Sequence, residues 1–100
     1  MIRVSRTFIR PNTNVAWFGT TASGMEVAAE RVALYGNKLS QPSNEFSQDG
    51  KTWKYSVTWA SRSDYNTAMA DSRIMAGIEL RKSYNAANGI TESITEINSI

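Results

Sequence analysis

The run Lys51–Ala60 constrains the fold more than any other part of the chain. Its odd positions carry Trp53, Tyr55, Val57 and Trp59, while its even positions carry threonine, lysine and serine. Strict alternation of large apolar and short polar residues, in types that favour extended backbone, is typical of a strand with one buried face. The sequence therefore predicts a half-buried sheet with this aromatic row on its covered face.

The residues before this strand predict a β-hairpin. Asp49-Gly50 is one of the strongest two-residue hairpin signals. Counting outward from such a turn places one aromatic residue opposite another, Phe46 opposite Trp53. It also places Glu45 opposite a lysine, so both cross-strand pairs are favourable.

The remaining patterns complete an order of strand, helix, strand, strand, helix, strand. Ser23 and Glu26 have the spacing of a capping box and predict the start of the first helix. Ser61 and Asp64 have the same spacing and predict the start of the second. The predicted elements are strands over 1–10, 44–48, 51–60 and 90–100 and helices over 23–36 and 61–88. The last segment also fits a helical stripe, but its β-branched residues favour a strand.

This order is that of a single ferredoxin-like α+β domain over residues 1–100, with a βαββαβ chain path. Its antiparallel sheet would carry two helices on one face. The first and third strands would be central, and the fourth would lie beside the first. The acids near the end of the chain would then pair with basic residues near its start; these are Glu92 and Glu96, and Arg3, Arg6 and Arg10.

Helical periodicity predicts which helix faces are buried. In the first helix the predicted buried face is Met25, Ala28, Ala29, Val32 and Tyr35. In the second it is Tyr65, Met69, Ala76, Leu80 and Ala87. Ile74 and Ile78 lie about half a turn away from this second stripe, and Gly77 is expected to mark a kink or a close contact.

The stretch Val57-Thr58-Trp59-Ala60-Ser61-Arg62-Ser63-Asp64-Tyr65 resembles the strand-to-helix passage of the dimeric α+β barrel proteins, the antibiotic-monooxygenase-like group. In that group a strand ends near a tryptophan and a short capped turn opens the second helix. The resemblance implies a dimer whose sheets face each other. Haem-degrading members of the group use a histidine on the second helix. This chain has no histidine, so no site residue is carried over.

Composition excludes several kinds of site. The absence of cysteine excludes disulfides and thiolate ligands, and the absence of histidine removes the commonest general base and metal ligand. No nucleophile–base pair and no glycine-rich phosphate loop is visible. We therefore expect no catalytic, cofactor-binding or metal-binding residues, and not an enzyme. No apolar run approaches a membrane span, and the charged N-terminus does not resemble an export signal, so a cytosolic or virion-borne protein is expected.

Two groups of residues are candidates for contact with other molecules. Trp17, Phe18, Ile74 and Ile78 are candidate interface anchors, unless they are satisfied inside the monomer. Twelve serines, nine threonines and eight asparagines resemble the composition of small phage-encoded proteins. These features favour a non-enzymatic interaction or structural module, such as a virion component or a host-factor binder. The expected partners are a second copy of the chain or another protein.

Two alternatives remain open. Trp53, Tyr55 and Trp59 could line the cavity of a dimeric barrel that binds or transforms a small apolar ligand, although aromatic residues on one strand face are more often core. Lys51-x-Trp53-x-Tyr55 also faintly resembles the base-stacking strand of RNA-recognition domains. That reading would require the helices to pack on the polar row of the strand, so nucleic-acid binding is disfavoured.

Overall fold

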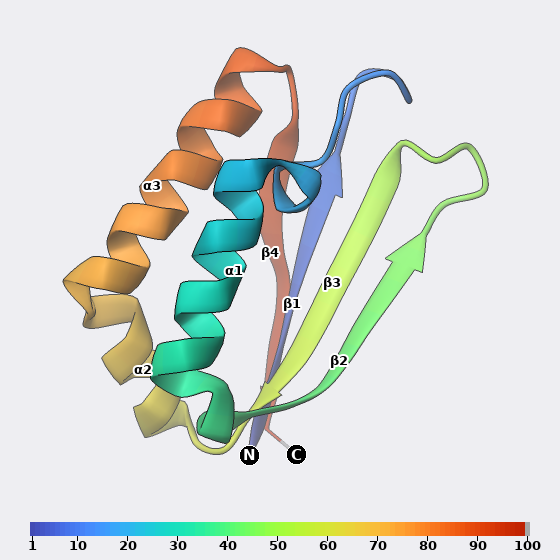
Figure 1. The fold of residues 1–100 in the computed structure, drawn as a ribbon. Coiled ribbons are helices and arrows are strands. Elements are labelled where there is room, and N and C mark those ends of the chain that lie inside the picture. Colours follow the sequence, from blue (N-terminus) through green and yellow to red (C-terminus); the bar gives the residue numbers. More distant parts are fainter. Residues whose placement is uncertain (100) are drawn as a thin grey trace.

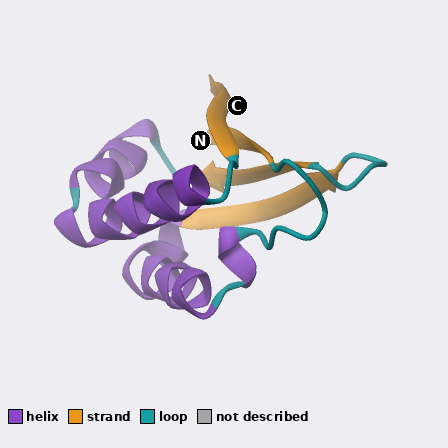
Figure 2. Cartoon of the chain, turned by 90° about the horizontal axis from the view of Figure 1, so that it is seen from above, coloured by secondary structure: helices purple, strands orange, loops and turns teal. Residues whose placement is uncertain are grey.

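Four antiparallel strands form one sheet in the order β2-β3-β1-β4, with every helix on the same face (Figures 1 and 2). The computed structural model describes residues 1–99. Its elements are β1 (Ile2–Ile9), η1 (Phe18–Thr20), α1 (Ala22–Tyr35), η2 (Gly36–Lys38), β2 (Leu39–Phe46), β3 (Thr52–Trp59), α2 (Arg62–Ala70), α3 (Ser72–Ala87) and β4 (Thr91–Ser99). The fold is ferredoxin-like. This confirms the predicted class, the central position of the first and third strands, and the last strand up to Ser99; Ile100 lies outside the described residues.

The β2–β3 hairpin has the predicted register. Glu45 lies opposite Lys54 and Phe46 opposite Trp53. Gly50 has a φ of 74°, in the left-handed region that glycine adopts without steric cost. However, β2 begins at Leu39, earlier than predicted, and runs through a proline with a register shift between residues 40 and 43. Because β2 is an edge strand, it tolerates a residue that cannot donate to the ladder.

The helix starts are set by hydroxyl side chains. The Ser61 hydroxyl accepts a hydrogen bond from the Asp64 backbone N–H at 3.0 Å, which confirms the predicted start of α2. The prediction that α1 is capped at Ser23 is wrong. The hydroxyl of Thr21 accepts from the Gly24 N–H at 3.0 Å, so the helix begins two residues earlier.

The second predicted helix is two helices. Asp71 has extended backbone, and its carboxylate accepts a hydrogen bond from the Arg73 N–H, which caps α3. Because the helix is interrupted at Asp71, the residues after it face in other directions than one continuous helix would give. The predicted buried face through Ala76 and Leu80 is therefore wrong. Leu80 is 54% exposed, whereas Ile74 and Gly77 are buried. Gly77 marks a close contact: a Cβ there would lie 2.8 Å from Val27 Cγ1 of α1.

The buried face of α1 also differs from the prediction. Met25 and Val32 are 58% and 59% exposed. Gly24 is buried, and Val27 and Arg31 are partly buried, so the inward face follows these residues instead. An arginine therefore occupies a position that the hydrophobic pattern assigns to the solvent side.

The predicted pairing of charges between the chain ends is wrong for Glu92. Its carboxylate binds Arg81 of α3 at 3.0 Å, and not an N-terminal arginine. Arg3 and Arg10 bind uncharged oxygens instead; Arg10, for example, donates to the backbone oxygens of Gly50 and Val15. The expectation for the side chain of Glu96 lies outside the described part of the chain.

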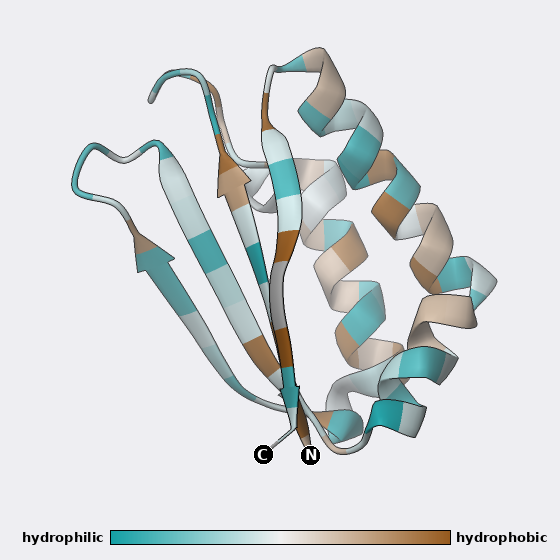
Figure 3. Ribbon diagram, turned by 180° about the vertical axis from the view of Figure 1, so that it is seen from behind, coloured by the Kyte–Doolittle hydropathy of each residue, from teal (hydrophilic) through white to brown (hydrophobic). Residues whose placement is uncertain are grey.

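No helix covers the other face of the sheet (Figure 3), and the residues of β1 and β3 that alternate with the cavity lining are mostly polar. Ser5 and Ser56 lie on this face and share a hydrogen bond of 2.7 Å between their hydroxyls. Arg3 extends over Thr58 and donates a hydrogen bond of 2.8 Å to its hydroxyl, which leaves Thr58 fully buried. Within residues 1–99, no helix has both the length and the apolar character that crossing a membrane requires.

Candidate functional site

The core consists of two clusters of buried residues. A cavity of about 300 Å³ lies between the sheet and the helices. One cluster holds Ile2, Val4, Val57, Trp59, Tyr65 and Ala68, and the other holds Phe8, Trp17 and Ile90. Residues from both clusters line the cavity. A ligand in this space would therefore be enclosed by the two parts of the core.

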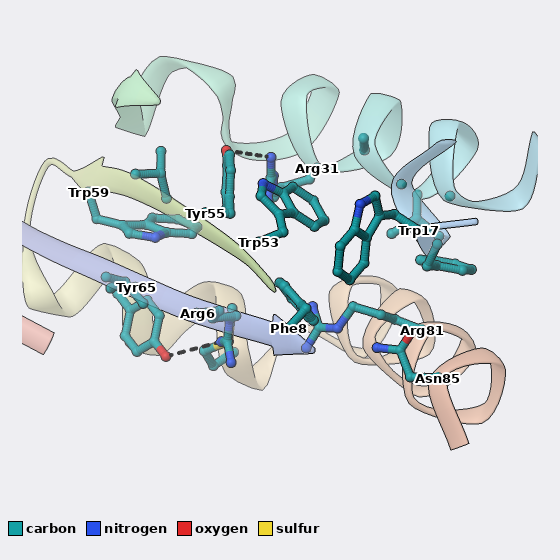
Figure 4. A pocket seen from close by; sticks show the side chains of 18 residues that line it. Arg6, Phe8, Trp17, Arg31, Trp53, Tyr55, Trp59, Tyr65, Arg81 and Asn85 are labelled. Atoms are coloured by element: carbon teal, nitrogen blue, oxygen red, sulfur yellow. Dashed lines mark hydrogen bonds between the residues drawn. The ribbon is translucent and has the colours of Figure 1, made fainter. Parts of the chain in front are cut away.

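Aromatic rings make up most of the cavity wall on the sheet side (Figure 4). Trp53 stacks on Phe8 with 5.1 Å between ring centroids, and Trp17 is tilted against Trp53 at 5.6 Å. Tyr55 lies 6.0 Å from Trp53 along the strand. The aromatic row read from the sequence, Trp53, Tyr55 and Trp59, is thus brought together on the wall of one cavity.

The structure places the four candidate interface residues mainly inside the chain. Trp17, Phe18 and Ile74 are each 8% exposed, and Ile78 is partly buried. Trp17 and Phe18 line the cavity. Phe18 also packs against Tyr84 of α3 with 5.6 Å between ring centroids.

Three arginines among the described residues also line the cavity, and one of them is ion-paired. Arg81 donates to both carboxylate oxygens of Glu92, at 3.0 and 3.1 Å. The Asn85 side-chain amide donates to the same carboxylate at 2.7 Å. The two bonds from Arg81 to Glu92 have the bidentate geometry that carboxylates favour with guanidinium groups. The charge of Arg81 is therefore largely compensated by Glu92.

Arg6 of β1 reaches the cavity without a carboxylate partner among the described residues. It has contacts at the limit of hydrogen bonding, 3.5 Å to the Tyr65 hydroxyl and 3.9 Å to the sulfur of Met69. Burial lowers the pKa of Arg6, and the neighbouring charge of Arg81 lowers it further; Tyr65 and Glu92 act in the opposite direction. Its guanidinium remains protonated, because arginine starts from a very high pKa.

Arg31 reaches the same cavity from α1. One of its terminal nitrogens donates to the Tyr55 hydroxyl at 3.1 Å, and its charge lies 5.4 Å from the centre of the Tyr55 ring. Its Nε–H is buried and has no hydrogen-bond partner. A buried donor without a partner costs free energy and calls for a physical explanation.

The cavity combines an apolar aromatic wall with a few convergent polar groups, which is the usual composition of a small-molecule site. An engineered cavity of about 150 Å³ holds one benzene ring, so this one accommodates about two fused rings. Among the described residues, no group of acidic side chains is placed to hold a metal ion. The polar groups available to a ligand are guanidinium, phenol and amide.

Comparison with solved structures supports this fold over the whole chain. A cofactor-independent oxygenase from Streptomyces nogalater, SnoaB, matches with a TM-score of 0.65 and 10% identity, over 99% of this chain and 91% of that one. A point mutant of SnoaB matches with a TM-score of 0.64. A putative antibiotic biosynthesis monooxygenase from Deinococcus radiodurans matches with a TM-score of 0.56 and 11% identity, over 100% and 92% of the two chains. No protein-family model and no curated protein matches the sequence.

These neighbours confirm the resemblance in architecture to antibiotic-monooxygenase-like proteins. They also correct the expectation of a non-enzymatic interaction or structural module, because the structures that share this fold are named as an oxygenase and a monooxygenase. Nothing in the comparisons supports a viral or phage role. The reading that they favour is the alternative one, a ligand bound or transformed in a cavity lined by tryptophan and tyrosine.

Sequence reasoning missed the arginines of the cavity. Arg6 belongs to the same alternating row as Val4 and Phe8 in β1, so strand periodicity could have placed it on the helix side. Arg81 follows Ile74 by seven residues, so the two lie on the same side of α3. Ile74 was not predicted to be buried, and the inward position of Arg81 was therefore missed. Arg31 gives no such signal, because hydrophobic periodicity places it on the solvent side.

Proposed function

We propose that the chain is an oxygenase that binds a small planar aromatic molecule in the cavity between β1, β3 and the helices. The observation that carries this proposal is the cavity itself, of about 300 Å³ and walled by Phe8, Trp17, Trp53 and Tyr55. Aromatic rings favour offset or tilted stacking on other rings, so a flat ligand can stack on this aromatic wall. The named activity of SnoaB supports the reaction class.

The reaction that fits this class uses molecular oxygen and an electron-rich substrate. A dihydroxynaphthalene, which has the expected size, would lose one ring C–H hydrogen and one phenolic hydrogen. One atom of O₂ would become the new ring carbonyl, and the other would leave as water with those two hydrogens. The product is a hydroxynaphthoquinone, and the substrate supplies all of the electrons that reduce O₂.

Within this proposal the chain's residues bind and orient the substrate and exclude water. Burial between the aromatic wall and the helices removes solvent, which strengthens each electrostatic contact with the substrate. The phenols of Tyr55 and Tyr65 and the guanidinium of Arg6 are polar groups that line the cavity. They would stabilise negative charge that develops on a substrate oxygen as its proton leaves.

Oxygen uptake with a dihydroxynaphthalene tests the proposal, with quinone formation followed by absorbance. Quenching of tryptophan fluorescence reports binding, because Trp17 and Trp53 line the cavity. We expect saturable quenching, and one quinone formed for each O₂ consumed.

Two neighbouring alanines of α1 provide a matched pair of variants. Both residues are exposed, and only Ala28 lines the cavity. Ala28→Trp should fill the cavity and weaken quenching and turnover about tenfold or more, whereas Ala29→Trp should leave both unchanged. Equal behaviour of the two variants, or no binding by the unmodified chain, contradicts the proposal.

A further inference from the structure

We infer that Arg10 is a positioning residue for ligand binding, because it holds the ring of Trp17 in place as part of the cavity wall. Arg10 itself does not line the cavity, so it acts on the ligand only through Trp17. This inference rests on the proposed function and names a residue on which the stacking surface depends. It is carried by the contacts of one guanidinium group with two loops and an indole ring.

Trp17 lies outside regular secondary structure. Residues 10–17 join β1 to η1 without forming a helix or strand, and Trp17 ends this segment. Every other residue that lines the cavity belongs to β1, to β3 or to one of the helices. Strand pairing fixes Phe8 and Trp53, whereas the ring of Trp17 depends on contacts from side chains.

The Arg10 side chain supplies such contacts. Its Nε–H donates to the backbone carbonyl of Gly50 in the β2–β3 turn at 2.9 Å, and a terminal N–H donates to that of Val15 at 2.8 Å. The same guanidinium lies 4.5 Å from the centre of the Trp17 ring. A planar guanidinium can stack on an aromatic face while its N–H groups donate in fixed directions. Arg10 therefore connects the segment before Trp17 to the hairpin turn and contacts the ring itself.

The hairpin turn lies close enough to receive this side chain. Gly50 has a φ of 74°, and a Cβ on it would lie 3.3 Å from Cγ2 of Thr13 and 3.7 Å from a terminal nitrogen of Arg10. The segment 10–17 therefore packs directly on the turn. Because β3 follows this turn, Arg10 links the loop to the strand that supplies the aromatic row of the cavity.

The Trp17 ring forms part of the stacking surface of the cavity (Figure 4). It is 8% exposed, and its centroid lies 5.6 Å from that of Trp53. Without the Arg10 guanidinium, the ring would keep this aromatic contact but lose the cation and the connection of its loop to the turn. The loop would stay attached to α3, because the Tyr84 hydroxyl donates to the Ala16 carbonyl at 2.6 Å. We therefore expect the ring to become mobile while the chain stays folded.

Calorimetric titration of the full chain with naphthol tests the inference. Arg10→Gln should weaken binding about threefold to tenfold, because the ligand would stack on an indole ring that no longer has a fixed position. Arg3→Gln is the matched control. Arg3 also donates to three uncharged oxygens, but it does so on the open face of the sheet and lies outside the cavity lining. The affinity of Arg3→Gln for naphthol should be unchanged.

Further variants show whether Arg10 acts through Trp17. Trp17→Leu removes the ring and keeps an apolar side chain, and in that background Arg10→Gln should cause no further loss of affinity. Fluorine NMR of the chain labelled with fluorotryptophan gives a readout without ligand. In Arg10→Gln the resonance of Trp17 should shift or broaden, whereas that of Trp59, in the other core cluster, should not change. Arg10→Lys keeps the charge without the planar fork, so its affinity should be intermediate.

Equal affinities of Arg10→Gln and Arg3→Gln would overturn the inference, and so would a loss that persists in full in the Trp17→Leu background. Failure of the proposed function gives a different result. If naphthol does not bind to the unmodified chain, the proposed function is wrong, and the fluorine resonance of Trp17 then decides the role of Arg10. An unchanged Trp17 resonance in Arg10→Gln would show that Arg10 does not hold the ring.

Discussion

At the scale of single residues, Gly24 in the first turn of α1 is the glycine with the least room for a side chain. A Cβ atom there would collide with the carbonyl oxygen of Phe18, and that carbonyl also accepts hydrogen bonds from the backbone N–H and the hydroxyl of Thr21. The obstacle is backbone rather than a flexible side chain, so it cannot move aside. Glycine therefore allows η1 to pack against the first turn of α1, next to the cavity.

We expect Gly24→Ala to lower the free energy of unfolding by about 1–3 kcal/mol, because the added methyl group must displace η1. Urea unfolding followed by circular dichroism measures this change. Gly36→Ala is the control: its Cβ would lie 3.2 Å from Cγ1 of Val32, an exposed side chain that can turn away. We expect a change within about 0.5 kcal/mol there. Equal losses in both variants would contradict the argument.

Single residues also show how far the sequence predicts this site. Alternation in β3 placed Trp53, Tyr55 and Trp59 on one face, and the structure has them on one wall. The same reasoning could not place Arg31, because the direction in which a helix faces depends on its packing against η1 and α3. Periodicity predicts burial of apolar side chains, and an inward guanidinium is an exception to that rule.

At the scale of elements, the junction between α2 and α3 is held by the side chain of Asp71. Its carboxylate accepts hydrogen bonds from the Arg73 backbone and guanidinium and, at 2.8 Å, from the Tyr35 hydroxyl of α1. Hydrogen bonds from Arg73, and then from Tyr35, hold the pKa of Asp71 far below its usual range. The sequence did not predict this junction, because an aspartate between two helix-forming stretches is also compatible with one continuous helix.

We expect the folded chain to lose stability in acid through Asp71. Its pKa is lower in the folded than in the unfolded state, so the unfolded state binds more protons as the pH falls below the ordinary aspartate value of about 3.9. The stability that the Asp71 carboxylate contributes is fully present above this pH. It is lost progressively as the pH falls toward the pKa of Asp71 in the folded chain. Asp71→Asn can still cap α3 but carries no charge.

Unfolding free energies measured over an acidic pH series test this expectation. The curve for Asp71→Asn should be flatter below about pH 4 than that of the unmodified chain, and Tyr35→Phe should fall between them. Asp71→Asn should also be less stable than the unmodified chain at neutral pH. Parallel curves for all three proteins would show that Asp71 does not link folding to protonation.

At the scale of the whole molecule, the two faces of the sheet have different roles. The helix side encloses the cavity, whereas no helix covers the other side (Figure 3), on which alternation in β1 and β3 places serine, threonine and a few charged residues. The cavity joins side chains from β1, β3 and the helices, which lie far apart in the chain. No local pattern in the sequence could therefore have indicated its size, although alternation in β1 could have placed Arg6 on its wall and the order of elements sufficed to predict the fold.

We expect two chains to associate through the open sheet face, as the resemblance to dimeric α+β barrel proteins implies. Light scattering should then give a mass of twice 11.1 kDa over a range of concentrations. Ile9 is 48% exposed and alternates with Phe8, so it lies on the open face. Ile9→Asp should give single chains, because it places a carboxylate in the interface.

Met25→Asp is the control, since Met25 is 58% exposed on the helix side and its replacement should leave the mass unchanged. Ile74→Asp is unsuitable as a test of association, because Ile74 is buried within the single chain and the substitution would unfold it. A single-chain mass at every concentration would contradict the dimer. Because the cavity is lined by residues of one chain, ligand binding should then persist in the monomer.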